Sequence, residues 1–337
     1  MEKGTSVGIA ALGYHVPEGV MTCDEISKLS GIPVHVYMDK IGMRSKHIAG
    51  PDEHPADMGI EASKMALRNA GLQGDDIDVV VYCGAGFYDH RIWCPSARIQ
   101  DAIGASDCYG FEVRNGCNGG NLGLNLAKHL LLQDPEKRHA LVVCADKLSI
   151  LVDHSDPDSL SLHHLADGAA AAVVSKGETC NCIGSYASVT DGSIVDRVMI
   201  PGGGTRRPFH QGIEMREVQF VVDDPKGLED IFSNVYLHNY EKVIDRALKL
   251  EGKDREDISY LFTNQVKKSL SNNILKTIGL REEQYMSVIA EYGHVGPTDT
   301  FFCLAKAMEK DMIEEGDLVV LASSGTGFTW GATTVQF

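Results

Sequence analysis

The residue best suited to covalent chemistry is Cys117, which lies in the segment RNGCNGG of residues 114–120. An apolar run ends at Arg114 and a helical pattern begins at Asn118, so we expect the thiol at a strand-to-helix turn. Near a helix N-terminus the positive end of the helix dipole favours the thiolate, which is the nucleophilic form. Neighbouring glycines permit a sharp turn and close approach of a substrate. We therefore predict that Cys117 is a nucleophile rather than one more buried thiol.

The other cysteines have no arrangement that indicates chemistry. Nine cysteines is an odd number, and most lie in apolar runs, which favours buried free thiols in a reducing cytosol over a disulfide framework. Cys180 and Cys182 form one close pair, whereas a zinc site normally needs two such pairs. The histidines also lack ligand spacing, so we expect no metal.

Strands and helices that would position Cys117 alternate along the chain, which predicts an α/β fold with a mainly parallel sheet covered on both faces. Two halves, residues 1–175 and 227–337, have a similar order of elements without repeating residues, and residues 176–226 look like a connection rich in Gly, Pro and charge. A single doubly wound domain is the alternative, although 337 residues exceeds the usual size. We predict helices at 55–70, 95–103, 118–132, 227–250, 267–277 and 298–315, and strands at 6–12, 79–83, 109–114, 140–145, 169–174, 258–263, 286–290, 318–322 and 331–337.

Composition restricts the class of protein. A chain of 337 residues with 43% hydrophobic residues can bury a large core without disulfides or metals. The net charge of -16 argues against nucleic acid as a partner, but an acidic carrier protein needs only a local basic patch. Because the first 11 residues lack a secretion-signal pattern and no apolar run is long enough to span a membrane, we predict a cytoplasmic protein without membrane association.

Three segments resemble ketoacyl-ACP synthase III, a family of the thiolase superfamily. Residues 324–331 read SGTGFTWG, similar to the family's GGGFTWG; residues 40–49 read KIGMRSKHIA, similar to RTGIRxRHIA; and residues 165–170 read LADGAA, similar to FGDGAG. Cys117 falls where the family keeps its nucleophile. The resemblance runs from about residue 6 to residue 337 and implies the five-layered αβαβα thiolase fold built from two similar halves.

The resemblance assigns roles around the thiol, and the chain departs from the family at two of them. Attack on a thioester creates an oxyanion, for which the family pattern implies the backbone N–H groups of Cys117 and Thr326. Asn264 stands where the family has His in its HQAN motif, and His294 stands where it has Asn in its GNT motif. The exchange keeps one imidazole and one amide near the thiol.

Two further features of the same region have alternative interpretations. Asp299 follows His294 by five residues at a predicted helix start. Its carboxylate could hold the His294 ring and complete a Cys-His-Asp grouping suited to acyl transfer, or it could be an ordinary first-turn Asp. His163 and His164 lie where the family lines its acyl pocket, so one could face the substrate, or both could be structural.

The resemblance implies a CoA or phosphopantetheine thioester as substrate and no separate cofactor. The family's adenine-stacking Trp corresponds to Val36, and a nearby Arg to Lys40, so the stacking contact is lost. Basic residues could still bind the phosphate-bearing arm or an acidic carrier protein, although each alone is more often a solvated surface charge. These residues are Lys40, Arg44, Arg206, Arg207, Lys267 and Lys268.

We therefore expect an acyltransferase in which an acyl-CoA or acyl-carrier thioester acylates Cys117, similar to variant starter-unit and acyl-transferring relatives in antibiotic pathways. The second step is either transfer to a hydroxyl, amine or thiol with His294 as base, which we favour, or decarboxylative condensation with a malonyl thioester bound by Asn264 and His294. A thioester hydrolase and a non-catalytic partner subunit are less favoured. The family also implies a two-fold homodimer, for which we expect pairing across residues 140–145.

Overall fold

The computed structural model describes residues 6–178 and 180–337; residues 1–5 of the predicted N-terminal half, and Thr179, lie outside the described residues. Its helices are α1 (Cys23–Ser30), α2 (Pro55–Ala70), α3 (Pro95–Ile103), α4 (Gly119–Gln133), α5 (Pro225–Leu250), α6 (Lys268–Ile278), α7 (Ile289–Tyr292) and α8 (Asp299–Glu309). Its strands are β1 (Val7–His15), β2 (Gly19–Thr22), β3 (Ser45–Ile48), β4 (Val79–Tyr82), β5 (Tyr109–Glu112), β6 (His139–Lys147), β7 (Asp167–Lys176), β8 (Cys182–Thr190), β9 (Val198–Met199), β10 (Val221–Val222), β11 (Tyr260–Thr263), β12 (Leu318–Gly325) and β13 (Thr329–Gln336).

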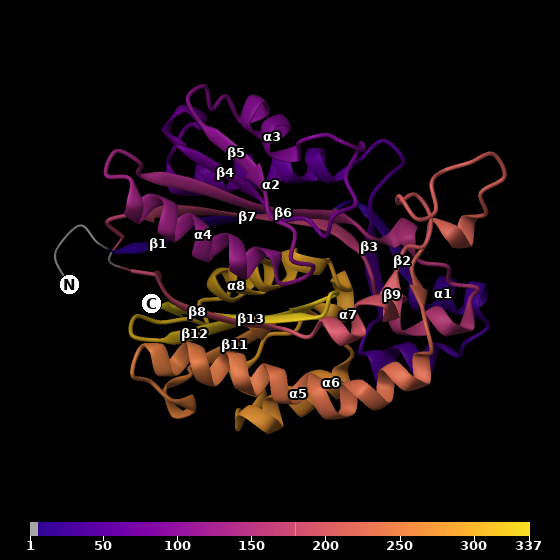
Figure 1. Ribbon diagram of the computed structural model, residues 1–337. Helices are drawn as coiled ribbons and strands as arrows, with labels where there is room; N and C mark the ends of the chain where they lie inside the picture. Colours follow the sequence, from indigo (N-terminus) through magenta and orange to yellow (C-terminus); the bar gives the residue numbers. More distant parts are fainter. Residues whose placement is uncertain (1–5, 179) are drawn as a thin grey trace.

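These elements form the five layers of the thiolase fold. Nine strands are ordered β11-β12-β13-β8-β1-β7-β6-β4-β5, and the pair Gly8 and Cys182 joins the two parts of the sheet. The two parts face each other across α4 and α8 (Figure 1). Helices α2 and α3 cover one outer face, and α5 and α6 cover the other. The architecture therefore follows the prediction of a five-layered αβαβα fold. The prediction of a mainly parallel sheet is wrong, because β1, β7, β8 and β13 pair antiparallel with their neighbours and only β4, β5, β6, β11 and β12 take part in parallel pairs.

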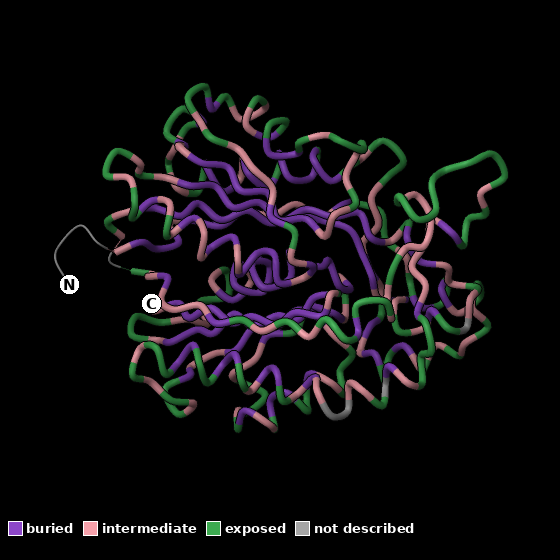
Figure 2. Tube along the Cα trace, in the orientation of Figure 1, coloured by how far each residue is buried: buried purple, intermediate pink, exposed green. Residues whose placement is uncertain are grey.

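The burial pattern explains why two helices occupy the middle layer. On α4, Leu124, Ala127 and Leu131 are buried between the two sheet faces, and on α8 every residue from Asp299 to Ala305 is buried. A helix covered on two sides can be apolar over most of its surface, whereas the outer helices keep one polar face. Figure 2 shows this buried centre, and it shows that most of the segment between β9 and β10 is exposed.

One predicted strand does not form, and a short helix begins within it. A strand is predicted over residues 286–290, but residues 286–288 have no regular structure, residues 289–290 begin the short helix α7, and the chain turns at Gly293. The Gln265 side chain supplies the reason, because its Oε1 accepts hydrogen bonds from the backbone N–H groups of Val288 and Ile289 at 2.8 and 3.1 Å. A strand would need those donors for its own pairing. This correction matters because α7 leads directly into His294.

The predicted connection also contains a strand of the main sheet. Residues 176–226 include β8, which pairs antiparallel with β13 from Cys182 to Thr190. The remaining part, from β9 to β10, is the exposed excursion of Figure 1. β8 is only partly buried, so its sequence lacks the continuous apolar run that marks a fully buried strand. The sequence pattern therefore did not indicate this strand.

The strand expected at a dimer edge lies inside the sheet. β6, which contains residues 140–145, pairs with β4 on one side and β7 on the other, so its backbone has no free edge. β5 ends the sheet instead, and its first residue, Tyr109, is exposed. The homodimer stays a prediction, with β5 as the strand open to it. Within residues 6–178 and 180–337, no helix combines the length and apolar character needed to cross a membrane.

Candidate active site

Cys117 lies on a tight turn between β5 and α4, where the strand-turn-helix pattern predicted it. Gly116 adopts a left-handed backbone with φ of +53°, which glycine tolerates best, and Asn118 occupies the N-cap position of the following helix. Asn118 is buried, and its Nδ2 donates to Asn115 Oδ1 at 2.7 Å and to the Tyr186 hydroxyl at 2.8 Å. The thiol is therefore held on a rigid turn, is partly exposed, and faces the N-terminal end of α4.

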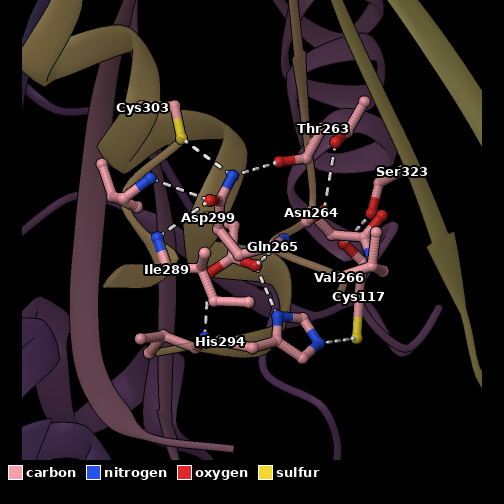
Figure 3. Close-up of polar contacts among 12 residues, drawn as sticks. Cys117, Thr263, Asn264, Gln265, Val266, Ile289, His294, Asp299, Cys303 and Ser323 are labelled. Atoms are coloured by element: carbon pink, nitrogen blue, oxygen red, sulfur yellow. Dashed lines mark hydrogen bonds and ion pairs between the residues drawn. The ribbon is translucent and has the colours of Figure 1, made fainter. Parts of the chain in front are cut away.

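His294 and Asp299 lie on the other side of the thiol, in the loop between α7 and α8. His294 Nε2 lies 3.5 Å from Cys117 Sγ, and His294 Nδ1 is hydrogen-bonded to Asp299 Oδ2 (Figure 3). The ring thus bridges the thiol and the carboxylate, with one nitrogen toward each. The structure brings together the three residues of the predicted Cys-His-Asp grouping, which is an arrangement used to activate nucleophiles.

The backbone around His294 is fixed by a neighbouring segment. The His294 N–H donates to the His164 carbonyl at 2.8 Å, and the Ala166 N–H donates to the His294 carbonyl at 2.9 Å. Gly293 has a φ of +72°, and a Cβ there would come within 2.6 Å of the His164 carbonyl oxygen. Only glycine fits this position without displacing the loop, so the sequence Gly293-His294 sets the place of the imidazole.

Asp299 is 1% exposed and is held by donors from two directions. Its Oδ2 accepts from the Gln265 N–H at 2.5 Å as well as from His294, and its Oδ1 accepts from the Val295 N–H at 2.8 Å. A buried carboxylate is tolerated when such donors replace its water shell. Besides beginning α8 as a first-turn Asp, the side chain therefore orients the ring of His294.

Electrostatics favour the protonated form of His294. Burial alone would lower the pKa of its imidazole, but the negative charges of Asp299 and Cys117, with the hydrogen bonds to both, raise the pKa well above its ordinary value. An imidazolium next to a thiol stabilises the thiolate. Because the Cys117 contribution requires a charged sulfur, forming a thioester there would remove it and would let His294 release its proton more readily.

Asn264 is buried beside the same network, with its amide orientation determined by two donors. Its Oδ1 accepts from the Tyr240 hydroxyl at 2.5 Å and from the backbone N–H of Ser324 at 3.0 Å. Since a backbone N–H can only donate, the atom facing it is the oxygen, and the amide NH₂ remains as the donor side of Asn264. The preceding residue, Ser323, donates from Oγ to the Cys117 carbonyl at 2.8 Å, so one strand end links Asn264 to the nucleophile.

Thr326 lies on the exposed loop after β12, against the nucleophile turn. A Cβ on Gly116 would lie 3.0 Å from the Thr326 nitrogen, so the two backbones are in contact. This contact suits the predicted oxyanion site, which stays a prediction. A cavity of about 290 Å³ opens at this junction and is lined by Ala85, Arg114, Asn115, Gly116, Thr190, Thr326, Gly327 and Thr329.

The two histidines before β7 differ in their surroundings. The His163 ring is buried and satisfied, with Nδ1 2.9 Å from the Tyr37 hydroxyl and Nε2 3.0 Å from Ser159 Oγ. It is therefore structural. The His164 ring stacks on the His294 ring with centroids 5.4 Å apart and planes inclined by 19°, so this is the histidine of the pair that reaches the site.

The predicted basic residues lie on separate surface segments. Lys40, on the π-helix η1 (Val36–Ile41), is exposed, as is Lys267 at the start of α6, and η1 packs against α6. Arg44 is exposed and pairs with Glu291 at 2.9 Å. Arg206 and Arg207 lie on the excursion between β9 and β10, where Arg207 pairs with Glu217. Binding of a phosphate-bearing arm by these five residues stays a prediction.

Sequence reasoning missed the residues that hold the reactive groups. Gln265, which fixes both Asp299 and α7, had a visible signal because it adjoins Asn264 in the motif. Tyr240 had only a weak one, its spacing of four residues from Tyr236 on one face of α5. Lys46 had an unused signal, because it falls in residues 40–49 where the family pattern has Arg, but its full burial and its hydrogen bonds to two backbone carbonyls are visible only in the structure.

Comparison with known proteins identifies the family. The chain matches the family 3-oxoacyl-[acyl-carrier-protein] synthase III over residues 111–192 and the C-terminal domain of that family over residues 248–337, together just over half of its length. It is similar to the β-ketoacyl-[acyl-carrier-protein] synthase III of Solibacter usitatus, with 28% identity covering 96% of this chain and 97% of that protein.

Solved structures show the same fold. The 3-oxoacyl-[acyl-carrier-protein] synthase III of Aquifex aeolicus superposes with a TM-score of 0.86 at 22% identity, covering 98% of this chain and 100% of that one. The priming β-ketosynthase of the R1128 polyketide pathway superposes with a TM-score of 0.87 at 19% identity, covering 100% of this chain and 98% of that one. The chain therefore belongs to the ketoacyl-ACP synthase III-like enzymes of the thiolase superfamily.

Proposed function

We propose that this enzyme is an acyltransferase in which Cys117 accepts an acyl group from acyl-CoA or an acyl carrier protein and passes it to a hydroxyl, amine or thiol. The observation that carries the proposal is the position of the His294 ring between Cys117 Sγ, at 3.5 Å, and the buried carboxylate of Asp299. A base that removes a proton from a heteroatom acceptor needs a partner for the charge it gains, and Asp299 supplies it.

The two half-reactions use the same imidazole. In the first, Nε2 of His294 takes the proton of Cys117, Sγ attacks the thioester carbonyl, and the departing pantetheine thiolate takes that proton as its C–S bond breaks. In the second, Nε2 takes the proton of the acceptor while the acceptor heteroatom bonds to the acyl carbon. The C–Sγ bond then breaks, and the proton returns to Cys117.

Decarboxylative condensation with a malonyl thioester is the second candidate, and one observation favours it. The Asn264 amide presents its NH₂ as donor because Tyr240 and Ser324 occupy its oxygen. Such a donor, with His294, could bind the carbonyl on which negative charge develops as CO₂ leaves. The relatives reported above are named as synthases, which is the condensing chemistry. We place it second because condensation does not require the carboxylate at Asp299.

The proposal is tested by loading and chase. Incubation with a panel of acyl-CoAs and acyl carrier proteins, followed by intact mass and peptide mapping, is expected to give one acyl group on Cys117. The isolated acyl-enzyme is then mixed with alcohol, amine and thiol acceptors, and formation of an ester, amide or thioester supports the proposal. Release of free acid alone would identify a hydrolase, and failure of every donor to load would indicate a non-catalytic subunit.

A further inference from the structure

His164 has no role in the reaction described above, yet its ring lies against the proposed base. The stack with His294 has a centroid separation of 5.4 Å and an interplanar angle of 19°. Neighbouring His163 has both ring nitrogens occupied by Tyr37 and Ser159. Among the residues that the structure describes, neither ring nitrogen of His164 has a hydrogen-bond partner, and the residue is partly exposed.

The surroundings of His164 keep its ring neutral. Burial, followed by the positive charges of His294 and Lys46, lowers the pKa of His164 well below its ordinary value. The Lys46 ammonium group is held next to His164, because its Nζ donates to the carbonyls of His163 and Leu165, on either side of His164, at 2.9 and 2.8 Å. A neutral imidazole offers one N–H donor and one nitrogen acceptor.

We propose that His164 is an acceptor-binding residue, and that its neutral imidazole holds a second hydroxyl group of an acceptor whose first hydroxyl group is deprotonated by His294. The inference rests on the proposed acyl transfer and narrows its acceptor to a compound with hydroxyl groups on adjacent carbons. The first hydroxyl proton goes to Nε2 of His294, its oxygen bonds to the acyl carbon, the C–Sγ bond breaks, and the proton passes to Cys117. The second hydroxyl group does not react.

The chemistry of the two rings favours a diol over other acceptors. A hydroxyl group both donates and accepts, which matches the two unlike nitrogens of a neutral imidazole. Because the two rings are stacked nearly parallel with centroids 5.4 Å apart, we expect hydroxyl groups on neighbouring carbons to reach one ring each. An ammonium group would instead approach the positive charge of Lys46 and would have no free electron pair for attack on the acyl carbon, so an amine acceptor is disfavoured.

Pairs of acceptors that differ by one hydroxyl group test the inference. Loaded enzyme is mixed with propane-1,2-diol or propan-1-ol, and the transfer rates are compared for wild type, His164→Phe and His164→Gln. We expect wild type to prefer the diol by about 3- to 10-fold, the effect of one hydrogen bond between neutral groups. His164→Phe keeps an aromatic ring for stacking but is expected to lose the preference, and His164→Gln is expected to keep part of it.

The outcomes separate this inference from the proposed function. Loading of Cys117 reports that each variant is folded, and His164→Leu replaces the phenylalanine variant should that one fail to load. A phenylalanine variant that keeps the wild-type preference, or a wild type without any preference, overturns the role of His164 and leaves acyl transfer standing. A wild type that loads but transfers to no alcohol, amine or thiol overturns both proposals.

Discussion

The N-terminal ends of the two central helices, α4 and α8, differ in how far their functional candidates are exposed. Before α4, Cys117 is partly exposed on a turn that glycine makes possible, whereas at the start of α8, Asp299 is 1% exposed and accepts from the backbone N–H groups of Gln265 and Val295. One helix start leaves the proposed nucleophile partly exposed, and the other buries a carboxylate that is hydrogen-bonded to the proposed base. The comparison teaches that two halves of similar architecture would divide the proposed chemistry, with the candidate nucleophile Cys117 in one half and the candidate base His294 with Asp299 in the other.

Removing the Cys117 thiol is expected to have the largest effect on activity. Cys117→Ala and Cys117→Ser should abolish acyl loading, because neither side chain supplies a thiolate. Intact mass after incubation with acyl donor is the measurement. Cys94→Ala, at an exposed cysteine before α3, is the matched control and should load normally. An adduct on another cysteine, or turnover by the alanine variant, would contradict the assignment.

Removing the base is expected to affect transfer more than loading. His294→Asn should still form the Cys117 adduct but should slow its transfer to a heteroatom acceptor by roughly 10²- to 10⁴-fold, as is typical for loss of acid–base catalysis. Rapid-quench measurement of deacylation gives the rate, with His129→Asn on the exposed face of α4 as control. Transfer at the wild-type rate would make His294 a structural residue.

The condensation alternative makes a different prediction for the same position. If Asn264 and His294 bind a malonyl carbonyl, the double variant Asn264→His with His294→Asn restores the family's arrangement of imidazole and amide. That variant should then decarboxylate malonyl thioester faster than His294→Asn alone. Under the proposed heteroatom transfer we expect no such recovery, because the imidazole at position 264 would not lie next to Asp299.

Removing the buried carboxylate is expected to have a smaller effect. Asp299→Asn should slow transfer by roughly 10- to 100-fold, since it orients and charges the base without moving the proton. Because the charge of Asp299 raises the pKa of His294, its loss should lower that pKa, and the limb of the pH–rate profile that reports His294 should move to lower pH. Asp101→Asn on the exposed surface of α3 is the control. If the His294 limb of the pH–rate profile does not shift, Asp299 only stabilises the first turn of α8 and does not influence the pKa of His294.

Loosening Asn264 is expected to have the smallest effect. Tyr240→Phe removes one of the two donors to its oxygen and leaves the Ser324 N–H, so transfer should change by less than about 10-fold, while the free energy of unfolding falls by about 1 kcal/mol. Urea unfolding and transfer rates measure the two quantities, with exposed Tyr109→Phe as control. A loss of transfer as large as that of His294→Asn would place Asn264 at the centre of the chemistry and favour condensation.

The layered fold could be predicted because its signals are local. The helices over residues 55–70 and 95–103 begin at Pro and end before Gly, and the structure reproduces both ranges. The position of Cys117 on a strand-to-helix turn follows from the same kind of pattern. The proximity of His294 and Cys117, which are 177 residues apart, came only from the family resemblance.

What could not be predicted depends on contacts between distant segments. α7 replaces a predicted strand because Gln265 captures two backbone donors, and β6 is no edge because β4 pairs along it. The stack of His164 on His294 likewise depends on how two loops meet. Gln265 adjoins Asn264 in the family motif, but the partners that these residues contact leave no period or motif in the sequence.

The central claim is that the acyl group of Cys117 moves to a heteroatom and not to a malonyl carbon. The most direct measurement follows the wild-type acyl-enzyme with malonyl thioester labelled in its free carboxyl group, alongside an alcohol acceptor, counting labelled CO₂ and ester formed per enzyme. The account predicts ester formation without labelled CO₂ above the background of Cys117→Ala. Release of one labelled CO₂ for each acyl group consumed, with a 3-oxoacyl product, would contradict it.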